Sequence, residues 1–427
     1  MVACVASAAG FVAGGGDSAA AQTGRVGEVL VYGDVVHTMA GGKLSTIKNG
    51  VVWVEDGVVR AVGPADSTAM PRRAMTTLRA AVVVPGLIDG RSTAGLTGIF
   101  NNQREDQDAI ERSSPIQPEL RAIDAYHALD PLVGFLRDKG VTTLHTGHAM
   151  GEVVSGQTML VKTAGTNVSE ALVRDGVALA ATLSPAAIKG GGKSPGTRGK
   201  LVAMLRAELI AGREYAEKWS SHEADDAEGT GDDEGDGGNA PARDLRKEAV
   251  ARVLRGEMPL LVTANRVQDI DSALRLQEEF GFELWLDSGA ESYLMLDELR
   301  AREIEVFVHP TMARPWSEME NMSWTTAGVL ADAGIDVVMQ SSYEAYVPKV
   351  RVVLFEAAIA AVNGLGVERA MSAMTYDAAR VLGIDDRVGS IEVGKDGDLA
   401  LYDGDPLEYT TRCVGTVIEG IVVSDGE

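Results

Sequence analysis

The chain of 427 residues is poor in cysteine and in positive charge. Its two cysteines, Cys4 and Cys413, cannot form a disulfide framework. The formal net charge of −23 argues against nucleic acid and anionic membranes as partners, because an acidic surface is repelled by both. No uninterrupted apolar run reaches the ~18 residues that a membrane-spanning helix requires.

The first 22 residues are small and mostly apolar, and Ala19-Ala20-Ala21 before Gln22 resembles a signal-peptidase site. No Lys or Arg precedes the apolar run, although a signal peptide usually begins with one. Two interpretations therefore stay open for residues 1–22. They are a leader that exports the protein to the periplasm or outside the cell, or a disordered tail on a cytoplasmic protein.

Acidic residues concentrate between Glu223 and Asp236, in a Gly-rich run without apolar anchors. This composition predicts a solvated, disordered-like loop over residues 221–240 rather than a calcium- or partner-binding loop.

Both ends of the chain have the pattern of short strands. Residues 29–62 contain apolar runs broken by turns, among them an Asp56-Gly57 hairpin signal, and residues 399–423 repeat this style. We expect one small β-sandwich built from both ends, over residues 23–83 and 389–427.

The middle of the chain alternates short apolar strands with helix-like segments, which predicts a parallel sheet covered on both faces. Over residues 84–388 this pattern favours an α/β fold of the (β/α)₈ barrel type, whose working residues follow the carboxyl ends of the strands. The predicted strands are Ala81–Val84, Val141–Leu144, Ala178–Ala181, Leu260–Val262, Leu284–Leu286, Val306–Val308 and Val337–Met339. The predicted helices are Leu120–Lys139, Leu201–Trp219, Asp269–Phe280, Ala290–Arg302 and Val350–Val362.

Two motifs carry a family resemblance. The run from Val83 to Gly90 (VVPGLIDG) and the segment 375–406, with its GSIEVGKDGDL core, resemble the amidohydrolase superfamily and its imidazolonepropionase-like branch. In that family the first motif is followed by His-x-His, the first two ligands of zinc or another divalent metal. The resemblance implies metal-assisted hydrolysis of non-peptide C–N bonds and subunits that oligomerise.

The positions that match the family's metal ligands hold other residues. They are Arg91, Thr93, Thr263, Ser288 and Ser342. An arginine stays protonated and has no acceptor, so it cannot be a metal ligand. We therefore expect no metal cofactor and no ordinary metal catalysis. The favoured hypothesis is a degenerate family member, a pseudoenzyme that binds a small molecule at the barrel mouth.

Polar residues near the strand ends are the candidates for ligand binding. They are Arg91, Asn265, Arg266, Asp287, His145, His148, His309, Ser341 and Glu344. The two arginines could bind a carboxylate.

Three alternatives stay open. One is a relocated metal site made by the three histidines with Asp287 or Glu344. Another is a metal-free nucleophile, Ser288, Ser341 or Ser342, beside His309 and Asp287. The third is a non-catalytic subunit that pairs with an active relative.

Overall fold

The computed structural model describes residues 28–71, 76–99, 107–227, 240–309, 311, 315, 317–343, 350 and 352–426. The predicted leader at residues 1–22, most of the predicted acidic loop and Glu344 lie outside the described residues. The division into domains at residues 23, 84 and 389 stays a proposal.

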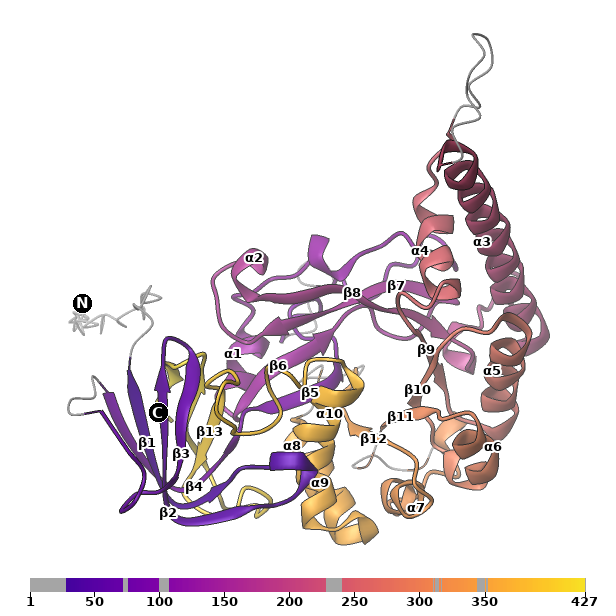
Figure 1. The fold of residues 1–427 in the computed structure, drawn as a ribbon. Helices are drawn as coiled ribbons and strands as arrows, with labels where there is room; N and C mark the ends of the chain where they lie inside the picture. Colours follow the sequence, from indigo (N-terminus) through magenta and orange to yellow (C-terminus); the bar gives the residue numbers. More distant parts are fainter. Residues whose placement is uncertain are drawn as a thin grey trace, which may run out of the picture.

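Seven strands from the two chain ends form one sheet (Figure 1). The N-terminal part supplies β1 (Val29–His37), β2 (Thr46–Glu55), β3 (Val58–Pro64) and β4 (Thr76–Pro85); the C-terminal part supplies β13 (Leu399–Tyr402), β14 (Cys413–Ile418) and β15 (Ile421–Ser424). The order is β15-β14-β13-β4-β1-β2-β3, so β4 joins the two ends by pairing with both β1 and β13. The expected composite β unit built from both chain ends is confirmed, and its seven strands belong to one sheet. The Asp56-Gly57 turn has the two positive φ angles that a tight hairpin needs.

The second sheet has eight strands and closes almost completely into a barrel. The strands are β5 (Leu87–Ser92), β6 (Val141–Thr146), β7 (Val154–Lys162), β8 (Leu172–Thr182), β9 (Leu260–Ala264), β10 (Leu284–Ser288), β11 (Glu305–Val308) and β12 (Val337–Met339). They follow one another in chain order, and a parallel bridge between Ser92 and Ser342 links the last strand back to the first. The predicted barrel is confirmed.

Two details of the predicted barrel are wrong. The run Ala81–Val84 belongs to β4 of the end sheet, and the barrel begins with the next run, Leu87–Ser92. The prediction also missed β7, which runs antiparallel to both β6 and β8. A short connection from β6 leads directly into β7 without a crossover helix, and antiparallel neighbours need none.

Helices cover the outside of the barrel. They are α1 (Pro131–Arg137), α2 (Val168–Ala171), α3 (Arg198–Ala227), α4 (Leu245–Leu254), α5 (Val267–Phe280), α6 (Leu296–Ala301), α7 (Thr326–Asp332), α8 (Val353–Ala360), α9 (Val367–Ala373) and α10 (Tyr376–Val381). Short 3₁₀ turns occupy 40–42, 122–124, 185–187, 292–294 and 317–319, and a π-type turn occupies 361–365. The predicted helix over 120–139 is regular only from Pro131, because Asp130 caps that end by accepting the Leu132 amide.

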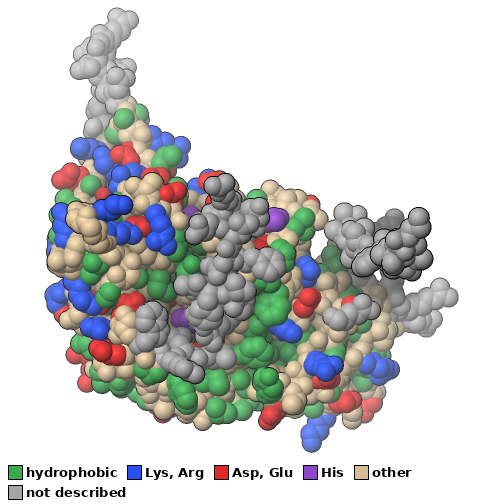
Figure 2. All heavy atoms as spheres, turned by 180° about the vertical axis from the view of Figure 1, so that it is seen from behind, with side chains coloured by type: hydrophobic (Ala, Val, Ile, Leu, Met, Phe, Trp, Pro, Cys, Tyr) green, Lys and Arg blue, Asp and Glu red, His purple; other side chains and the backbone are tan. Residues whose placement is uncertain are grey.

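The pair α3 and α4 projects away from the barrel (Figure 1). Basic and acidic side chains are intermingled over this projection (Figure 2), and ion pairs such as Arg246–Glu208 and Arg243–Glu248 join them. No helix of the described residues combines the length and hydrophobicity that a membrane crossing needs.

The barrel interior is filled by large side chains rather than by a channel. Ile88, Leu160, Leu261, Phe307 and Val338 are buried there, and the rings of Trp285 and Phe307 lie 5.1 Å apart. This packing closes the barrel below its mouth, so a ligand cannot bind deep inside the barrel and the carboxyl ends of the strands are the place to look for a site.

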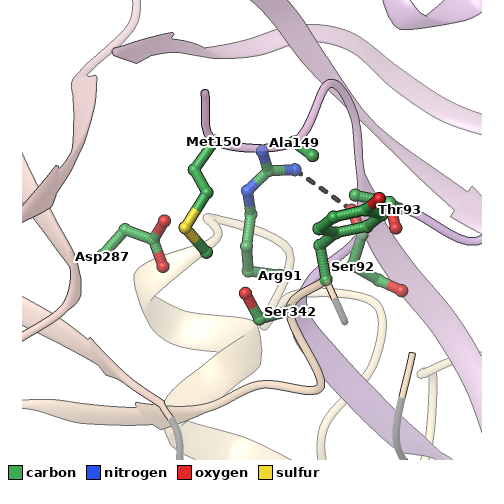
Figure 3. Close-up of a pocket in the computed structure, with 8 residues that line it drawn as sticks. Arg91, Ser92, Thr93, Ala149, Met150, Asp287 and Ser342 are labelled. Carbon is green, nitrogen blue, oxygen red and sulfur yellow. Dashed lines mark hydrogen bonds between the residues drawn. The ribbon is translucent and has the colours of Figure 1, made fainter. Parts of the chain in front are cut away.

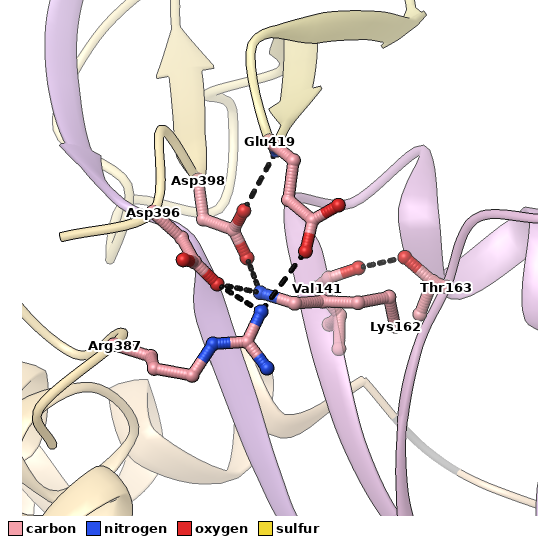
Figure 4. A network of polar contacts seen from close by, with 7 residues as sticks. All are labelled: Val141, Lys162, Thr163, Arg387, Asp396, Asp398 and Glu419. Atoms are coloured by element: carbon pink, nitrogen blue, oxygen red, sulfur yellow. Dashed lines mark hydrogen bonds and ion pairs between the residues drawn. The ribbon is translucent and has the colours of Figure 1, made fainter. Parts of the chain in front are cut away.

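A buried ionic network joins the barrel to the end sheet (Figure 4). Lys162, the last residue of β7, contacts Asp398 at 2.6 Å and Asp396 at 3.1 Å. Arg387 bonds Asp396 at 2.8 Å and Glu419 at 3.1 Å. Burial opposes the charge of Lys162, but the two aspartates outweigh it and raise its pKa. The network therefore fixes one end of the barrel against the sheet.

Candidate functional site

A pocket lies where the carboxyl ends of the barrel strands meet (Figure 3). It is lined by Arg91, Ser92, Thr93, Ala149, Met150, Asp287, Ser342 and Tyr343. The cavity is small, about 10 Å³, which is room for about one water molecule. Three of the five positions matched to the family's metal ligands thus line one pocket.

Arg91 lies at the end of β5 with only 4% of its surface exposed. Its Nη1 donates to the Ser92 carbonyl at 3.1 Å, and its Nη2 donates to the carbonyl of His148. Burial lowers the pKa of the guanidinium, and Asp287 and Asp89 oppose this effect. The group still remains a cation, because an arginine side chain is not deprotonated in proteins.

Asp89 lies beneath Arg91 and is completely buried. It accepts the Ser341 amide at 2.9 Å and the Ser341 hydroxyl, which ties β5 to the end of β12. Burial raises the pKa of Asp89 to about 7, and the bonds from Ser341 oppose the shift. Ser341 is therefore engaged with this carboxyl group.

Asp287 forms the opposite wall of the pocket, at the end of β10. Thr263 donates to one of its oxygens, and the Gln340 amide donates to the other at 2.7 Å. Both donors are neutral, so they orient the carboxylate without neutralising it. The Thr263 hydroxyl, at one of the predicted ligand positions, thus donates its hydrogen bond to Asp287.

The serines at two other ligand positions have an unusual backbone. Ser288 has φ 76° and Ser342 has φ 51°, in the left-handed region that residues other than glycine seldom adopt. Such conformations concentrate at functional sites, where surrounding structure must stabilise them.

Several buried polar atoms near the pocket have no hydrogen-bond partner. They are Thr93 Oγ1, Ser288 Oγ, Gln340 Oε1 and His148 Nδ1. These residues are at most 4% exposed, and buried polar atoms in folded proteins are nearly always satisfied. Several such atoms near the same end of the barrel indicate a site where a polar ligand or an ordered water forms the missing hydrogen bonds.

Among the described residues, the histidines do not converge with carboxylates into a metal site. Burial lowers the pKa of His145 to about 3, so its ring is neutral, and Arg91 adds to the effect. Its Nδ1 lies 2.7 Å from the Gly90 carbonyl and must donate to it, which leaves Nε2 to accept from Thr158 at 2.6 Å. Both nitrogens are therefore engaged inside the barrel. Burial also lowers the pKa of His148, to about 4.

The remaining predicted residues lie around the pocket rather than in its lining. His309 follows β11 and is buried. Asn265 accepts the Ala290 amide at 3.3 Å, and Arg266 donates to Glu320 at 2.9 Å. Arg266 is thus paired with an acidic side chain and is not a lining residue of the Arg91 pocket.

The side chains at the mouth do not fit a divalent metal. Among the residues that the structure describes, no group of three or more His, Cys, Asp or Glu side chains could hold a metal ion. A guanidinium that donates to two carbonyls occupies the first ligand position, and hydroxyls stand at four others. Hydroxyls are weak ligands beside imidazole or carboxylate.

The sequence interpretation missed several residues of the candidate site, among them Ser92 and Ala149 of the pocket lining. Gln340 orients Asp287, and Met150 and Tyr343 line the pocket. Gln340 could have been found, because it directly follows β12. Met150 lies in a loop between β6 and β7, and no sequence signal places it beside β10.

Known proteins resemble the chain over most of its length. A model of the Amidohydrolase family matches residues 327–424. The amidohydrolase tasK of Hapsidospora irregularis is 24% identical over 361 residues, or 80% of this chain, and the aligned region spans only 36% of that relative's length. An imidazolonepropionase of Bacteroides fragilis is 43% identical over 61 residues, which are 13% of this chain and 15% of the relative.

A solved structure extends the resemblance to the whole fold. The amidohydrolase from Thermotoga maritima MSB8 superimposes with a TM-score of 0.82 at 25% identity, covering 93% of this chain and 100% of its own. Family model, sequence relatives and fold agree, and the chain belongs to the amidohydrolase superfamily.

Proposed function

We propose that this protein is a pseudoenzyme of its superfamily: it binds a small molecule at the barrel mouth and does not perform metal-assisted hydrolysis. The observation that carries the proposal is the position of Arg91. Its guanidinium is buried at the first metal-ligand position and bonded to two carbonyls, so a permanent cation stands where a metal would have to bind.

The ligand-binding part of the proposal is supported by the unsatisfied atoms beside the pocket. Three of these buried atoms are Thr93 Oγ1, Ser288 Oγ and Gln340 Oε1. A polar ligand could supply the hydrogen-bond partners that they lack. Barrels of this kind bind their ligands at this end, and the packed interior below leaves no alternative inside the barrel.

Metal content is the first test. We expect less than about a tenth of an equivalent of zinc or manganese by plasma mass spectrometry, both as purified and after incubation with either metal. Close to one tightly bound equivalent would overturn the proposal and favour a hydrolase that retains metal.

Ligand binding is tested separately by thermal shift with a library of small polar molecules, because a ligand that binds the native state raises the melting temperature. We expect hits that Arg91→Met abolishes. The surface variant Arg206→Met is the matched control and should keep them. Hits that survive in Arg91→Met, or no hit in the wild type, would contradict binding at this mouth.

A further inference from the structure

The pocket has one positive and one negative wall. Arg91 and Asp287 lie on opposite sides, and the Met150 side chain lies between them (Figure 3). No ion pair within 4.0 Å joins Arg91 to a carboxylate of the described residues. The two charges are therefore close enough to influence each other but are not in contact.

Each wall has unused hydrogen-bonding capacity. A guanidinium has five N–H donors, and the contacts with Ser92 and His148 engage two of its nitrogens. A carboxylate can accept about four hydrogen bonds, and Asp287 accepts one from Thr263 and one from Gln340. Both groups can therefore bind a ligand without giving up a contact they already make.

The charges decide which ligand is complementary. A simple carboxylate would pair with Arg91 but would be repelled by Asp287, and a simple amine would meet the reverse conflict. Both side chains are buried, at 4% and 3% exposure, so an uncompensated charge on the ligand would be costly. A molecule that carries one positive and one negative group can pair with both Asp287 and Arg91, and it adds no net charge to the pocket.

We propose that the pocket binds a small α-amino acid as its zwitterion, with the carboxylate on Arg91 and the ammonium group on Asp287. The inference rests on the proposed ligand-binding function and names the chemical class of the ligand. The unpartnered hydroxyl of Thr93, which lines the same pocket, is available to the ligand carboxylate.

Met150 sets the size of this ligand. The cavity of about 10 Å³ holds about one water, so an amino acid enters only when the Met150 side chain moves out. Methionine is unbranched and flexible, which makes such a displacement inexpensive. Ala149 and Tyr343 remain as walls, so glycine and alanine fit better than larger amino acids.

The test is titration calorimetry of the full chain with four probes of similar size: glycine, L-alanine, acetate and methylamine. We expect glycine or alanine to bind at least about tenfold more tightly than acetate and methylamine, because each of those lacks one charged hydrogen-bonding group. Acetate that binds as tightly as glycine would overturn the zwitterion and indicate a simple anion site. Absence of glycine and alanine binding would overturn it as well.

Three variants test the geometry. Arg91→Met and Asp287→Asn should each lose amino-acid binding. Met150→Ala should strengthen binding of L-alanine by about threefold or more, because no side chain then has to move out of the pocket. Arg206→Met is the control and should bind as the wild type does. Circular dichroism establishes that each variant is folded. Glycine binding that survives in Asp287→Asn would overturn the assignment of the ammonium group.

Failure of this inference is distinguishable from failure of the proposed function. If the library yields Arg91-dependent ligands that are not amino acids, the pseudoenzyme proposal stands and the zwitterion is wrong. If one equivalent of metal binds, the pseudoenzyme proposal is wrong whatever the calorimetry shows.

Discussion

Two buried cations lie at opposite ends of this barrel and are paired in different ways. Lys162 contacts two aspartates within 3.1 Å, and Arg387 extends this network to Glu419. Among the described residues, the Arg91 guanidinium donates to two backbone carbonyls and forms no ion pair with a carboxylate. A buried charge that is neutralised by carboxylates from another part of the fold is a structural connection. A buried cation that donates only to neutral carbonyls is not neutralised. An anionic group of a ligand can therefore still form an ion pair with it.

The largest expected effect on the free energy of unfolding comes from breaking the ionic network around Lys162. Lys162→Met should destabilise the protein by roughly 3–5 kcal/mol, because the buried Asp398 would lose its cation, whereas the partly exposed Asp396 would keep Arg387. Urea unfolding measures the change. The double variant Lys162→Met, Asp398→Asn should recover part of it, and no recovery would contradict the electrostatic explanation.

The matching change at the mouth should cost less. Arg91→Met leaves the carbonyls of Ser92 and His148 unpaired, and we expect a loss of roughly 1–2 kcal/mol in the same unfolding experiment. A loss as large as that of Lys162→Met would mean that the charge of Arg91 is already neutralised, and the contrast between the two ends would fail.

A third charged group, Glu305, is partly buried, and its effect on stability can be tested by changing the pH. Burial raises the pKa of Glu305, at the start of β11, to about 7, and Glu283 and Asp336 add to the shift. The folded state then binds a proton more tightly than the unfolded state, so the stabilising contribution is present below about pH 4 and is lost as the pH rises towards 7. Glu305→Gln should therefore raise the melting temperature at pH 8 and change it little at pH 4. An equal change at both pH values would contradict this titration.

The smallest effect is expected on the projecting helices. Arg206 and Glu279 form an exposed pair at 2.8 Å, and Arg206→Met should change the free energy of unfolding by less than about 0.5 kcal/mol. A larger loss in urea unfolding would show that surface pairs on α3 matter more than their exposure indicates.

The sequence predicts the two-sheet architecture well because hydrophobic periodicity and turn residues are local signals. It fails at β7, since Val154–Lys162 is buried throughout and its direction depends on its neighbours. At the site, residue identities predict that the metal ligands are replaced. They do not reveal that the Arg91 guanidinium meets the carbonyl of His148, 57 residues away, or that Met150 lies beside Asp287. Those facts depend on tertiary packing.

The position of β4 has a consequence for synthesis on the ribosome. One edge of β4 pairs with β1, but its other partner, β13, begins roughly 310 residues later. At about 5–20 residues per second, translation of that stretch takes roughly 15–60 s. During this time the nascent chain has an apolar strand with one unpaired edge, which is a template for aggregation. The delay between β4 and β13 is therefore the interval in which this edge of β4 is open to pairing with another chain.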